Sequence, residues 1–284
     1  MSSEGDLRSG FVTLVGRPNV GKSTLLNRLC GTKVSIVSDK PQTTRRAIHG
    51  VLHRAGVQVV FVDTPGIGKP RTALGSRLNA TATEALDDVD VACLVVEATA
   101  PFGPGDRFVA SKLPATGVVV VNKIDAASPA RLLEQLARVS EVPAAAYFPL
   151  SARTGEGVEA FVEHLLARMP PGPPYYPEGM VSAIPDEVAV AELVREQLLA
   201  VVRDELPYAI ATQVTEWDWP RIRCEILVER ASQRRIVIGH RGDVLKRVGT
   251  EVRRQLPPGA YLELHVSVDP NWQDRPGAVE RYCG

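Results

Sequence analysis

A glycine-containing loop near the start of the sequence has the residue types and spacing of a phosphate-binding loop. Residues 16–23 read GRPNVGKS and follow a short apolar run at 11–15. Glycines let backbone N–H groups curve around a phosphate, a lysine adds positive charge, and a serine hydroxyl is a ligand for Mg²⁺. A chance glycine turn is the alternative. The expected nucleotide-binding residues here are Gly16, Asn19, Val20, Gly21, Lys22, Ser23 and Thr24.

The tetrapeptide Asp63-Thr64-Pro65-Gly66 ends a second strong apolar run at 57–62. A carboxylate at the end of such a strand can hold the coordination shell of Mg²⁺, and a glycine N–H can reach a γ-phosphate. Alone, a tetrapeptide of this kind is a weak signal. Together with the phosphate loop, it predicts that Asp63 binds Mg²⁺ and that Gly66 contacts the γ-phosphate.

The motif NKID at residues 122–125 predicts which base is bound. The Asp125 carboxylate can accept both N–H groups on the Watson–Crick edge of guanine, while Asn122 faces the Hoogsteen side. Adenine offers the opposite pattern and would leave a buried carboxylate unpaired, at a cost on the order of a few kcal/mol. We therefore expect guanine. The residues expected to contact it are Asn122, Lys123, Asp125, Ser151 and Ala152.

These motifs follow apolar runs that are expected to form one sheet. Near-continuous apolar runs separated by helical patterns are typical of strands buried on both faces of a mostly parallel sheet. Each motif then lies at the C-terminal end of a strand, where open α/β sheets bind their ligands. The expected strands are 11–15, 57–62, 91–96, 118–121 and 145–150, and the expected helices are 22–29, 77–86, 129–139 and 157–168.

Four motifs in this order resemble the translation-factor-related class of P-loop GTPases, over residues 11–169. The resemblance implies that Thr44, in the segment PQTTR at 41–45, closes over Mg²⁺ and the γ-phosphate and lets go after hydrolysis. Thr43 is the alternative, and without the other motifs both would be ordinary loop hydroxyls. The expected catalytic residues are Lys22, Thr44 and Gly66, and the expected Mg²⁺ ligands are Ser23, Thr44 and Asp63.

Ile67 stands where Ras-like proteins have the glutamine that orients the attacking water. An apolar side chain cannot orient water, so we expect slow intrinsic hydrolysis or help from a cation or a bound partner. Related GTPases with an asparagine at the position of Asn19 use it to hold potassium beside the phosphates. The resemblance thus implies K⁺ as a hypothetical cofactor, in addition to GTP or GDP and Mg²⁺.

The C-terminal part of the chain is expected to form a second, α+β domain. Five prolines between residues 170 and 177 end the regular structure of the first domain. A helical pattern at 188–203, strand-like runs at 210–217 and 222–229, a helix at 244–256 and a strand at 261–268 follow. The predicted organisation is a flexible N-terminus (1–10), an α/β GTPase domain with flanking helices (11–169), a Pro-rich linker (170–185) and the second domain (186–284).

The sequence GHRG at 239–242 resembles the loop of a type II KH domain. Apolar residues precede it, a predicted helix follows it, and residues 221–254 contain ten Lys or Arg against four Asp or Glu. Such a loop lets a sugar-phosphate backbone approach closely, and a KH groove holds about four nucleotides of single-stranded RNA. A plain turn with solvated arginines is the alternative. The expected RNA contacts are Arg234, Arg235, Gly239, His240, Arg241, Gly242, Lys246 and Arg247.

Nearly the whole chain resembles the Era family of GTPases. The resemblance is carried by PQTTR, the proline-rich linker, ELPY at 205–208 and VERASQ at 228–233. It implies slow GTP hydrolysis, binding to the 3′ end of 16S rRNA and assistance in maturing the 30S ribosomal subunit. It also allows peripheral association with the inner face of the cell membrane, although the sequence contains nothing that would anchor it there. Glu97 departs from the family, which usually has an aspartate at this strand end.

Composition and cysteine spacing exclude several classes of protein for this chain. The chain has 284 residues, 44% hydrophobic and 23% charged, and contains no apolar run of about 18 residues and no secretory signal. We therefore expect a cytoplasmic protein. The sequence does not indicate an oligomeric state, and a monomer is the default for a switch of this kind. Its four cysteines have no paired spacing that suggests disulfides or zinc. A non-catalytic RNA-binding scaffold with GTP as a structural ligand stays open because of Ile67, whereas a lipid-linked GTPase would need a lipidation signal that neither end of the sequence has.

Overall fold

The computed structural model describes residues 7–87 and 89–283. The chain divides into two compact units, and each is described by itself. Residues 1–37, 44–69 and 78–183 belong to the first, and residues 38–43, 70–77 and 184–284 to the second. None of the helices in the described part of the chain has the length and apolar character needed to span a membrane.

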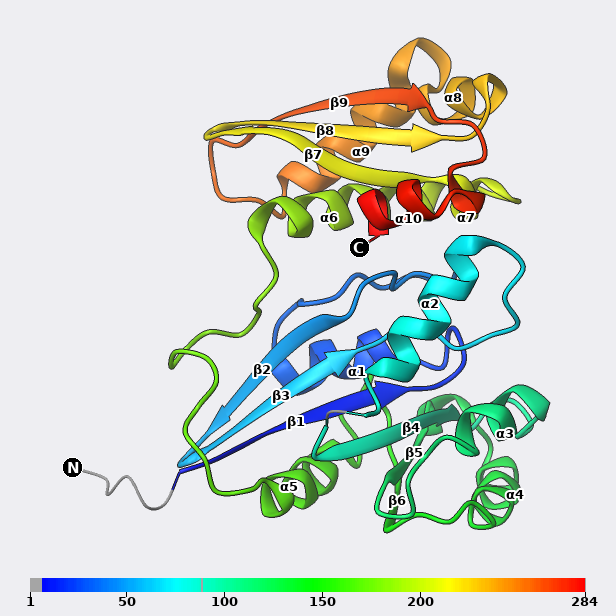
Figure 1. Cartoon of the computed structure of the whole chain (residues 1–284), viewed down its shortest axis with the longest axis vertical. Coiled ribbons are helices and arrows are strands. Elements are labelled where there is room, and N and C mark those ends of the chain that lie inside the picture. Colours follow the sequence, from blue (N-terminus) through cyan, green and yellow to red (C-terminus); the bar gives the residue numbers. More distant parts are fainter. Residues whose placement is uncertain (1–6, 88, 284) are drawn as a thin grey trace. The chain divides into compact units, whose positions relative to one another are not determined.

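A six-stranded sheet forms the centre of the first unit (Figure 1). Its strand order is β2-β3-β1-β4-β5-β6, and every neighbouring pair is parallel except β2 with β3. All residues of β5 and nearly all of β4 are buried, which is why both appear in the sequence as continuous apolar runs. The strands are β1 (Arg8–Val15), β2 (Ile48–Arg54), β3 (Val57–Asp63), β4 (Val91–Glu97), β5 (Val118–Asn122) and β6 (Ala146–Pro149).

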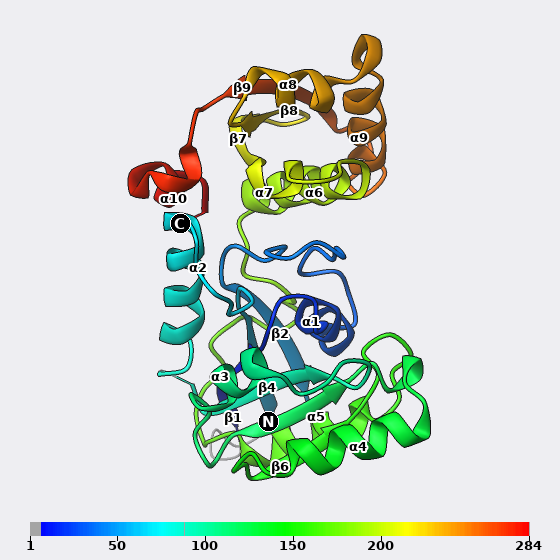
Figure 2. The same ribbon diagram turned by 90° about the vertical axis from the view of Figure 1, so that its right-hand side faces the viewer.

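Helices flank this sheet, as Figure 2 shows. Apolar residues of α2, α3 and α4 form one core with side chains of β1, β4 and β5. The helix α1 packs against β2 and β3, and α5 packs against β3. The expected α/β fold with a mostly parallel sheet is confirmed. The helices are α1 (Lys22–Cys30), α2 (Ala73–Glu84), α3 (Pro104–Ala110), α4 (Pro129–Val139) and α5 (Val158–Arg168).

Two elements of the first unit were not expected from the sequence. The strand β2 reads IHGVLHR, whose histidines and glycine hide its β character, and it pairs antiparallel with β3. The helix α3 is only seven residues long and begins with Pro-Gly. The strand β1 also starts at Arg8, inside the N-terminal segment expected to be flexible, whose residues 1–6 lie outside the described part.

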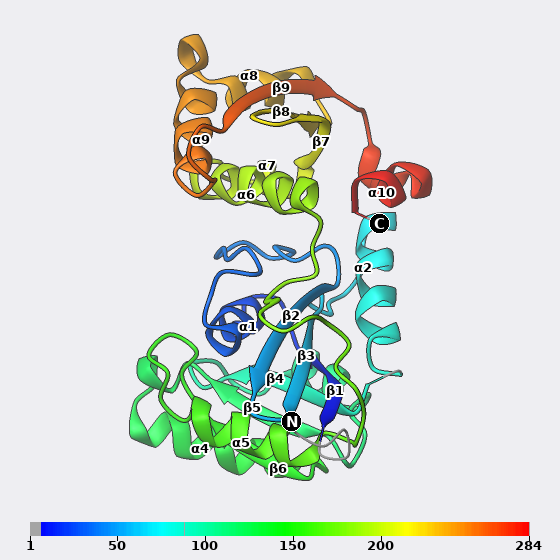
Figure 3. The ribbon, with the colours of Figure 1, turned by 90° about the vertical axis from the view of Figure 1, so that its left-hand side faces the viewer.

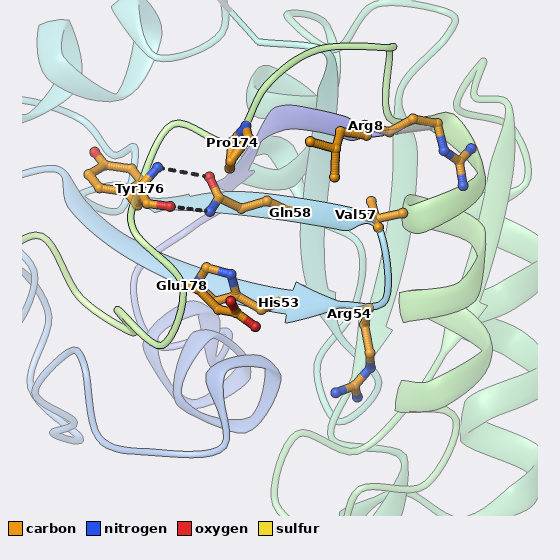
Figure 4. A pocket seen from close by; sticks show the side chains of 10 residues that line it. Arg8, His53, Arg54, Val57, Gln58, Pro174, Tyr176 and Glu178 are labelled. Atoms are coloured by element: carbon orange, nitrogen blue, oxygen red, sulfur yellow. Dashed lines mark hydrogen bonds between the residues drawn. The ribbon is translucent and has the colours of Figure 1, made fainter. Parts of the chain in front are cut away.

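The proline-rich segment after α5 is bound along the strands of the first unit. The backbone N–H of Val51 donates to Val181 O at 3.0 Å. The buried Gln58 side chain donates to Tyr176 O at 2.8 Å and accepts from Tyr176 N at 3.1 Å (Figure 4). A pocket of about 330 Å³ lies beside these hydrogen bonds between Gln58 and Tyr176. Its lining includes Arg8, His53, Arg54, Val57, Pro174 and Glu178 (Figure 4).

The second unit contains a three-stranded sheet of order β7-β8-β9 with helices packed against it (Figure 3). The first pair is antiparallel and the second parallel. Apolar side chains of α6, α8 and α9 share one core with the sheet. The order α6-β7-β8-α8-α9-β9 confirms the expected type II KH fold. The elements are α6 (Asp186–Val201), α7 (Leu206–Ala209), β7 (Ala211–Asp218), β8 (Arg221–Val228), α8 (Ala231–Ile238), α9 (Asp243–Arg253), β9 (Tyr261–Val268) and α10 (Pro276–Cys283).

Candidate functional site

The predicted phosphate loop connects the C-terminal end of β1 to the start of α1. Gly21 precedes the helix with a φ of 98°, and a Cβ atom there would lie 2.3 Å from Asn122 Nδ2. Only glycine fits this position without strain. Among the described residues no side chain caps the start of α1, so its first N–H groups are available to bind an anion.

Lys22 is buried directly beneath this loop. Its exposed fraction is 6%, and its Nζ donates to Gly16 O at 3.2 Å and to Arg17 O at 3.0 Å. Burial lowers the pKa of Lys22 to about 8, while the nearby Asp63 opposes this shift. Phosphate oxygens in the loop would favour the charged form of the lysine, because they bring negative charge next to it.

Three oxygen-bearing side chains meet where the sequence predicts Mg²⁺. Ser23 Oγ donates to Asp63 Oδ2 at 2.7 Å, and Thr44 Oγ1 lies 3.0 Å from Ser23 Oγ and 3.1 Å from Asp63 Oδ2. Hydroxyl and carboxylate oxygens are the ligands that Mg²⁺ prefers. Thr43 instead donates its hydroxyl to Lys40 O at 2.7 Å. The geometry therefore favours Thr44 over Thr43.

Asp63 itself has spare binding capacity. Its Oδ1 is buried and makes no hydrogen bond within the described residues. Burial raises the pKa of this carboxyl, and Lys22 and three hydroxyl groups counteract the rise. A buried carboxylate oxygen without a partner is costly, and a bound cation would remove that cost. The donor set and this oxygen both fit Mg²⁺.

Asn122 joins the three loops that surround the predicted guanine site. It is 2% exposed; its Nδ2 donates to Val20 O at 2.9 Å, and its Oδ1 accepts from the N–H of Ala152 at 3.0 Å and of Lys123 at 2.8 Å. Since both oxygen lone pairs are used, one N–H remains for a base. This residue is thus chiefly a connector of loops, a role that the sequence alone did not suggest.

Two neighbouring side chains fix the orientation of the Asp125 carboxylate. Ser151 Oγ donates to its Oδ1 at 2.6 Å, and Arg153 forms an ion pair with its Oδ2 at 2.5 Å. The Ser151 hydrogen bond, followed by the positive charge of Arg153, holds the pKa of Asp125 below its usual range. The carboxylate is therefore ionised and able to accept the N–H groups of guanine. Arg153 was not among the predicted site residues.

Lys123 connects the base-binding motif to the phosphate loop. It has a positive φ of 64°. Its Nζ donates to Asn19 O at 2.7 Å and forms an ion pair with Glu97 at 2.5 Å. Glu97, at the end of β4, had no role in the sequence-based prediction because only the fold brings the end of β4 beside Lys123.

Gly66 and Ile67 lie against the phosphate loop. A Cβ atom at Gly66 would be 2.6 Å from Pro18 N, so this close approach requires glycine. Ile67 donates its N–H to Gly16 O at 3.1 Å, and its side chain, 2% exposed, belongs to the apolar core. Because the apolar side chain of Ile67 lies in the core, it does not reach the place where a glutamine would orient the attacking water.

The predicted RNA-binding loop joins α8 to α9 through a short 3₁₀ turn, His240–Gly242. Gly239 has a φ of 79°, and a Cβ atom there would lie 2.0 Å from Asp243 Oδ1. Gly242 has a φ of 82° and open space around it. Asp243 accepts a hydrogen bond from Val244 N at 2.8 Å, which places a negative charge at the start of α9. Positive potential in this loop must therefore come from its cationic side chains.

The predicted RNA-contacting cations lie on both sides of this loop. Two are on α8, one is in the loop and two are on α9. Ile236, between the cations of α8 and the loop, is 58% exposed and was missed because its IVI run is typical of buried segments. The predicted RNA contacts with polar side chains are all exposed: Arg234, Arg235, His240, Arg241, Lys246 and Arg247.

Comparisons with known proteins agree with both halves of this description. Residues 11–123 match the family model of the 50S ribosome-binding GTPase, and residues 205–273 match that of the KH domain. Curated relatives include GTPase Era of Mycolicibacterium paratuberculosis and GTPase Era of Mycobacterium leprae. Each is 45% identical to this chain, over 97% of this chain and 98% of the relative.

Solved structures give the same result for the fold. A crystal structure of Era in complex with MgGDPNP and nucleotides 1506–1542 of 16S ribosomal RNA matches with a TM-score of 0.91 and 35% identity, over 97% of this chain and 98% of that one. An Aquifex aeolicus Era variant bound to GDP·AlF₄⁻ matches with a TM-score of 0.90 and 35% identity, over 97% and 99% of the two chains.

Proposed function

Because this chain belongs to the Era family of GTPases, we propose that it is a GTP-hydrolysing switch that binds 16S rRNA and assists assembly of the 30S subunit. The observation that carries the proposal is the convergence of Ser23, Thr44 and Asp63 beside the buried Lys22. Phosphoryl transfer depends mainly on positioning and on stabilising charge, and these residues supply both.

We assign the parts of GTP to the motifs as follows. Lys22 and the N–H groups that begin α1 hold the β- and γ-phosphates, and Gly66 N–H contacts the γ-phosphate. Ser23, Thr44 and Asp63 would hold Mg²⁺, which would neutralise charge on the phosphate oxygens. Guanine is recognised by Asp125, with contributions from the other base-binding residues. The supporting set is Gly16, Asn19, Val20, Gly21, Thr24, Asn122, Lys123, Ser151 and Ala152.

In the hydrolysis step, water attacks the γ-phosphorus and the bond to the β,γ-bridging oxygen breaks, giving GDP and phosphate. Ile67 cannot orient this water, so we propose slow intrinsic turnover and a K⁺ ion held near Asn19 as an activator. Turnover in matched potassium and sodium buffers tests the second part. Equal rates in the two buffers would rule out K⁺ as an activator.

We propose that the KH domain binds single-stranded RNA at the 3′ end of 16S rRNA. The loop glycines let the RNA backbone approach, the surrounding arginines and lysine contact phosphates, and Ile236 offers an apolar surface to a base. The relative bound to nucleotides 1506–1542 supports this choice of RNA. We further propose a monomer that works in the cytoplasm, with any membrane association peripheral.

The competing proposal is an RNA-binding scaffold in which GTP is only a structural ligand. The burial of Ile67 is the observation that favours it. The two proposals differ in one measurable property, which is multiple-turnover hydrolysis.

The test is GTP turnover in potassium buffer with and without a short RNA that matches the 3′ end of 16S rRNA. We expect turnover that the RNA stimulates and that is lost in Lys22→Ala, whereas Arg241→Ala should need several-fold more RNA to reach the same stimulation. Arg221→Ala is the matched control, because Arg221 is an exposed arginine of the same domain that pairs with Glu263 on the sheet at 2.8 Å. Absence of hydrolysis in the wild type, with RNA still bound, would support the scaffold instead.

A substitution at the loop glycine Gly239, such as Gly239→Asp, would not test RNA contact in this experiment. A side chain at Gly239 would collide with Asp243 and with the backbone of Val244, 2.9 Å from the new Cβ. Loss of RNA binding in that variant would then report a distorted loop. Arg241→Ala removes only an exposed cation, so its effect can be assigned to RNA contact.

A further inference from the structure

Ser35 makes a buried contact with the proposed magnesium carboxylate. It lies between α1 and the PQTTR segment, is 1% exposed, and donates its hydroxyl to Asp63 Oδ2 at 3.0 Å. The same Asp63 oxygen also accepts from Ser23 and is in contact with Thr44. Ser35 is thus a third hydroxyl on this carboxylate, and no motif in the sequence predicted it.

Asn27 fixes Ser35 to the helix that begins in the phosphate loop. Asn27 Oδ1 accepts from the N–H groups of Val34 and Ser35, both at 2.8 Å. Asn27 Nδ2 donates to Ser35 O at 2.8 Å. Since Asn27 belongs to α1, three hydrogen bonds hold the backbone around Ser35 to the same helix that carries Lys22 and Ser23.

Thr44 differs from Ser35 in the segment that holds it beside Asp63. It reaches Asp63 from the segment that, in the proposed function, closes on GTP and lets go after hydrolysis. Ser35 has its own anchor in Asn27 and does not depend on that segment for its position. Withdrawal of Thr44 would therefore leave the anchor that holds Ser35 beside the carboxylate in place.

We propose that Ser35 is a positioning residue that keeps Asp63 oriented toward Mg²⁺ in both the GDP and the GTP states. Groups that hydrogen-bond a metal-binding carboxylate fix its direction, and their loss weakens metal binding. Ser35 and Thr44 then have separable roles: Ser35 supports Mg²⁺ with either nucleotide, and Thr44 supports it only with GTP. The inference rests on the proposed placement of Mg²⁺ at Asp63.

The experiment measures release of fluorescent GDP, and of a fluorescent non-hydrolysable GTP analogue, over a series of Mg²⁺ concentrations. For Ser35→Ala we expect the Mg²⁺ concentration that half-suppresses release to rise about 10-fold for both nucleotides, as for the loss of one hydrogen bond to a charged group. Thr44→Ala should raise it only for the GTP analogue. With EDTA in place of Mg²⁺, wild type and Ser35→Ala should release GDP equally fast.

Ser9→Ala is the matched control, because Ser9 is 2% exposed and donates its hydroxyl to Pro173 O, away from the nucleotide motifs. Ser9→Ala should have the Mg²⁺ dependence of the wild type. Ser35→Thr keeps a hydroxyl at this position and should therefore also have the Mg²⁺ dependence of the wild type. If Ser35→Ala does not fold, Asn27→Ala should show the same shift in weaker form.

Two failures are distinguishable. If Mg²⁺ does not slow nucleotide release from the wild type, the placement of Mg²⁺ in the proposed function is wrong. If it does, and Ser35→Ala (or Asn27→Ala in its place) responds to Mg²⁺ as Ser9→Ala does, the inference about Ser35 is overturned. A shift confined to the GTP analogue would also overturn it, since Ser35 would then act only with Thr44.

Discussion

The proposed GTP site and the proposed RNA site of this chain are built from opposite kinds of side chain. In the GTP site, Lys22, Asp63 and Asn122 are at most 6% exposed and already hydrogen-bond to neighbouring loops. Around the KH loop, the five arginine and lysine side chains are exposed. Within residues 7–87 and 89–283 they make no hydrogen bond or ion pair with one another or with an acid.

This difference indicates how each site would recognise its ligand. Buried, preorganised groups reject a wrong ligand strongly, because any mismatch leaves a polar group unpaired. Exposed cations attract any phosphate backbone, with an affinity that depends on salt more than on sequence. We therefore expect changes in the GTP site to alter specificity, and changes around the KH loop to alter affinity.

The largest expected effect is that of Asp125→Asn on base choice. The carboxylate, held by Ser151, accepts two N–H groups of guanine, whereas an amide offers a donor that faces one of them. We expect GTP affinity to fall about 100-fold or more. Xanthosine triphosphate, which has an oxygen in place of the guanine amino group, should bind the variant better than GTP. Competition binding with both nucleotides measures this.

The control for that experiment is Arg153→Ala. It removes an ion pair with Asp125 but keeps the carboxylate, and Arg153 is largely exposed. This variant should keep its preference for GTP. If Asp125→Asn also keeps that preference, recognition of guanine does not depend on Asp125, and the contrast between the two sites fails.

The same contrast explains what the sequence could predict. The phosphate loop, the Asp63 motif and the NKID motif each follow an apolar strand, so local spacing was sufficient to find them. Glu97 and Ser35 act through contacts between distant segments, separated by 26 residues for Glu97 and Lys123 and by 28 for Ser35 and Asp63. Only the fold brings such residues together, so no local pattern could indicate them.

The elements that the sequence missed have a similar explanation. Strand β2 lies at the edge of the sheet and contains two histidines and a glycine, so it lacks the apolar run of a central strand. Helix α10, which was also not predicted, has only eight residues and begins at Pro276. Their regular structure depends on tertiary packing more than on local pattern.

An intermediate effect is expected for the cations of the KH loop. Arg241→Ala and Lys246→Ala should each weaken RNA binding several-fold and reduce the slope of log affinity against log salt by about 1, because each removes about one phosphate contact. Affinity for the 3′-end RNA and for an unrelated single strand, at several KCl concentrations, measures both quantities. The weakening should be similar for the two RNAs.

Arg221→Ala should leave the slope unchanged, since Arg221 lies on β8 outside the KH loop and is ion-paired with Glu263 of β9, which also pairs with Arg223. If Arg241→Ala weakened only the 3′-end RNA and left the slope as in the wild type, Arg241 would be reading bases. The KH loop would then recognise its ligand by specific contacts, as the GTP site does. The proposed difference between a specific GTP site and a salt-dependent RNA site would be wrong.

The smallest expected effect tests the partly exposed edge of the GTP site. Glu97 and Lys123 are 23% and 34% exposed, and their ion pair holds the lysine that also donates to Asn19 O. Ion pairs of intermediate exposure contribute less than buried ones, so Glu97→Gln should speed GDP release only about 2- to 5-fold. Glu134→Gln, which disturbs only the exposed ion pairs of α4 with Arg131 and Arg138, should have no effect. The measurement is stopped-flow release of fluorescent GDP at two salt concentrations. If the difference in rate between Glu97→Gln and the wild type shrinks at high salt, the ion pair with Glu97 holds Lys123 electrostatically. If Glu97→Gln releases GDP at the wild-type rate, the hydrogen bond to Asn19 O alone positions Lys123.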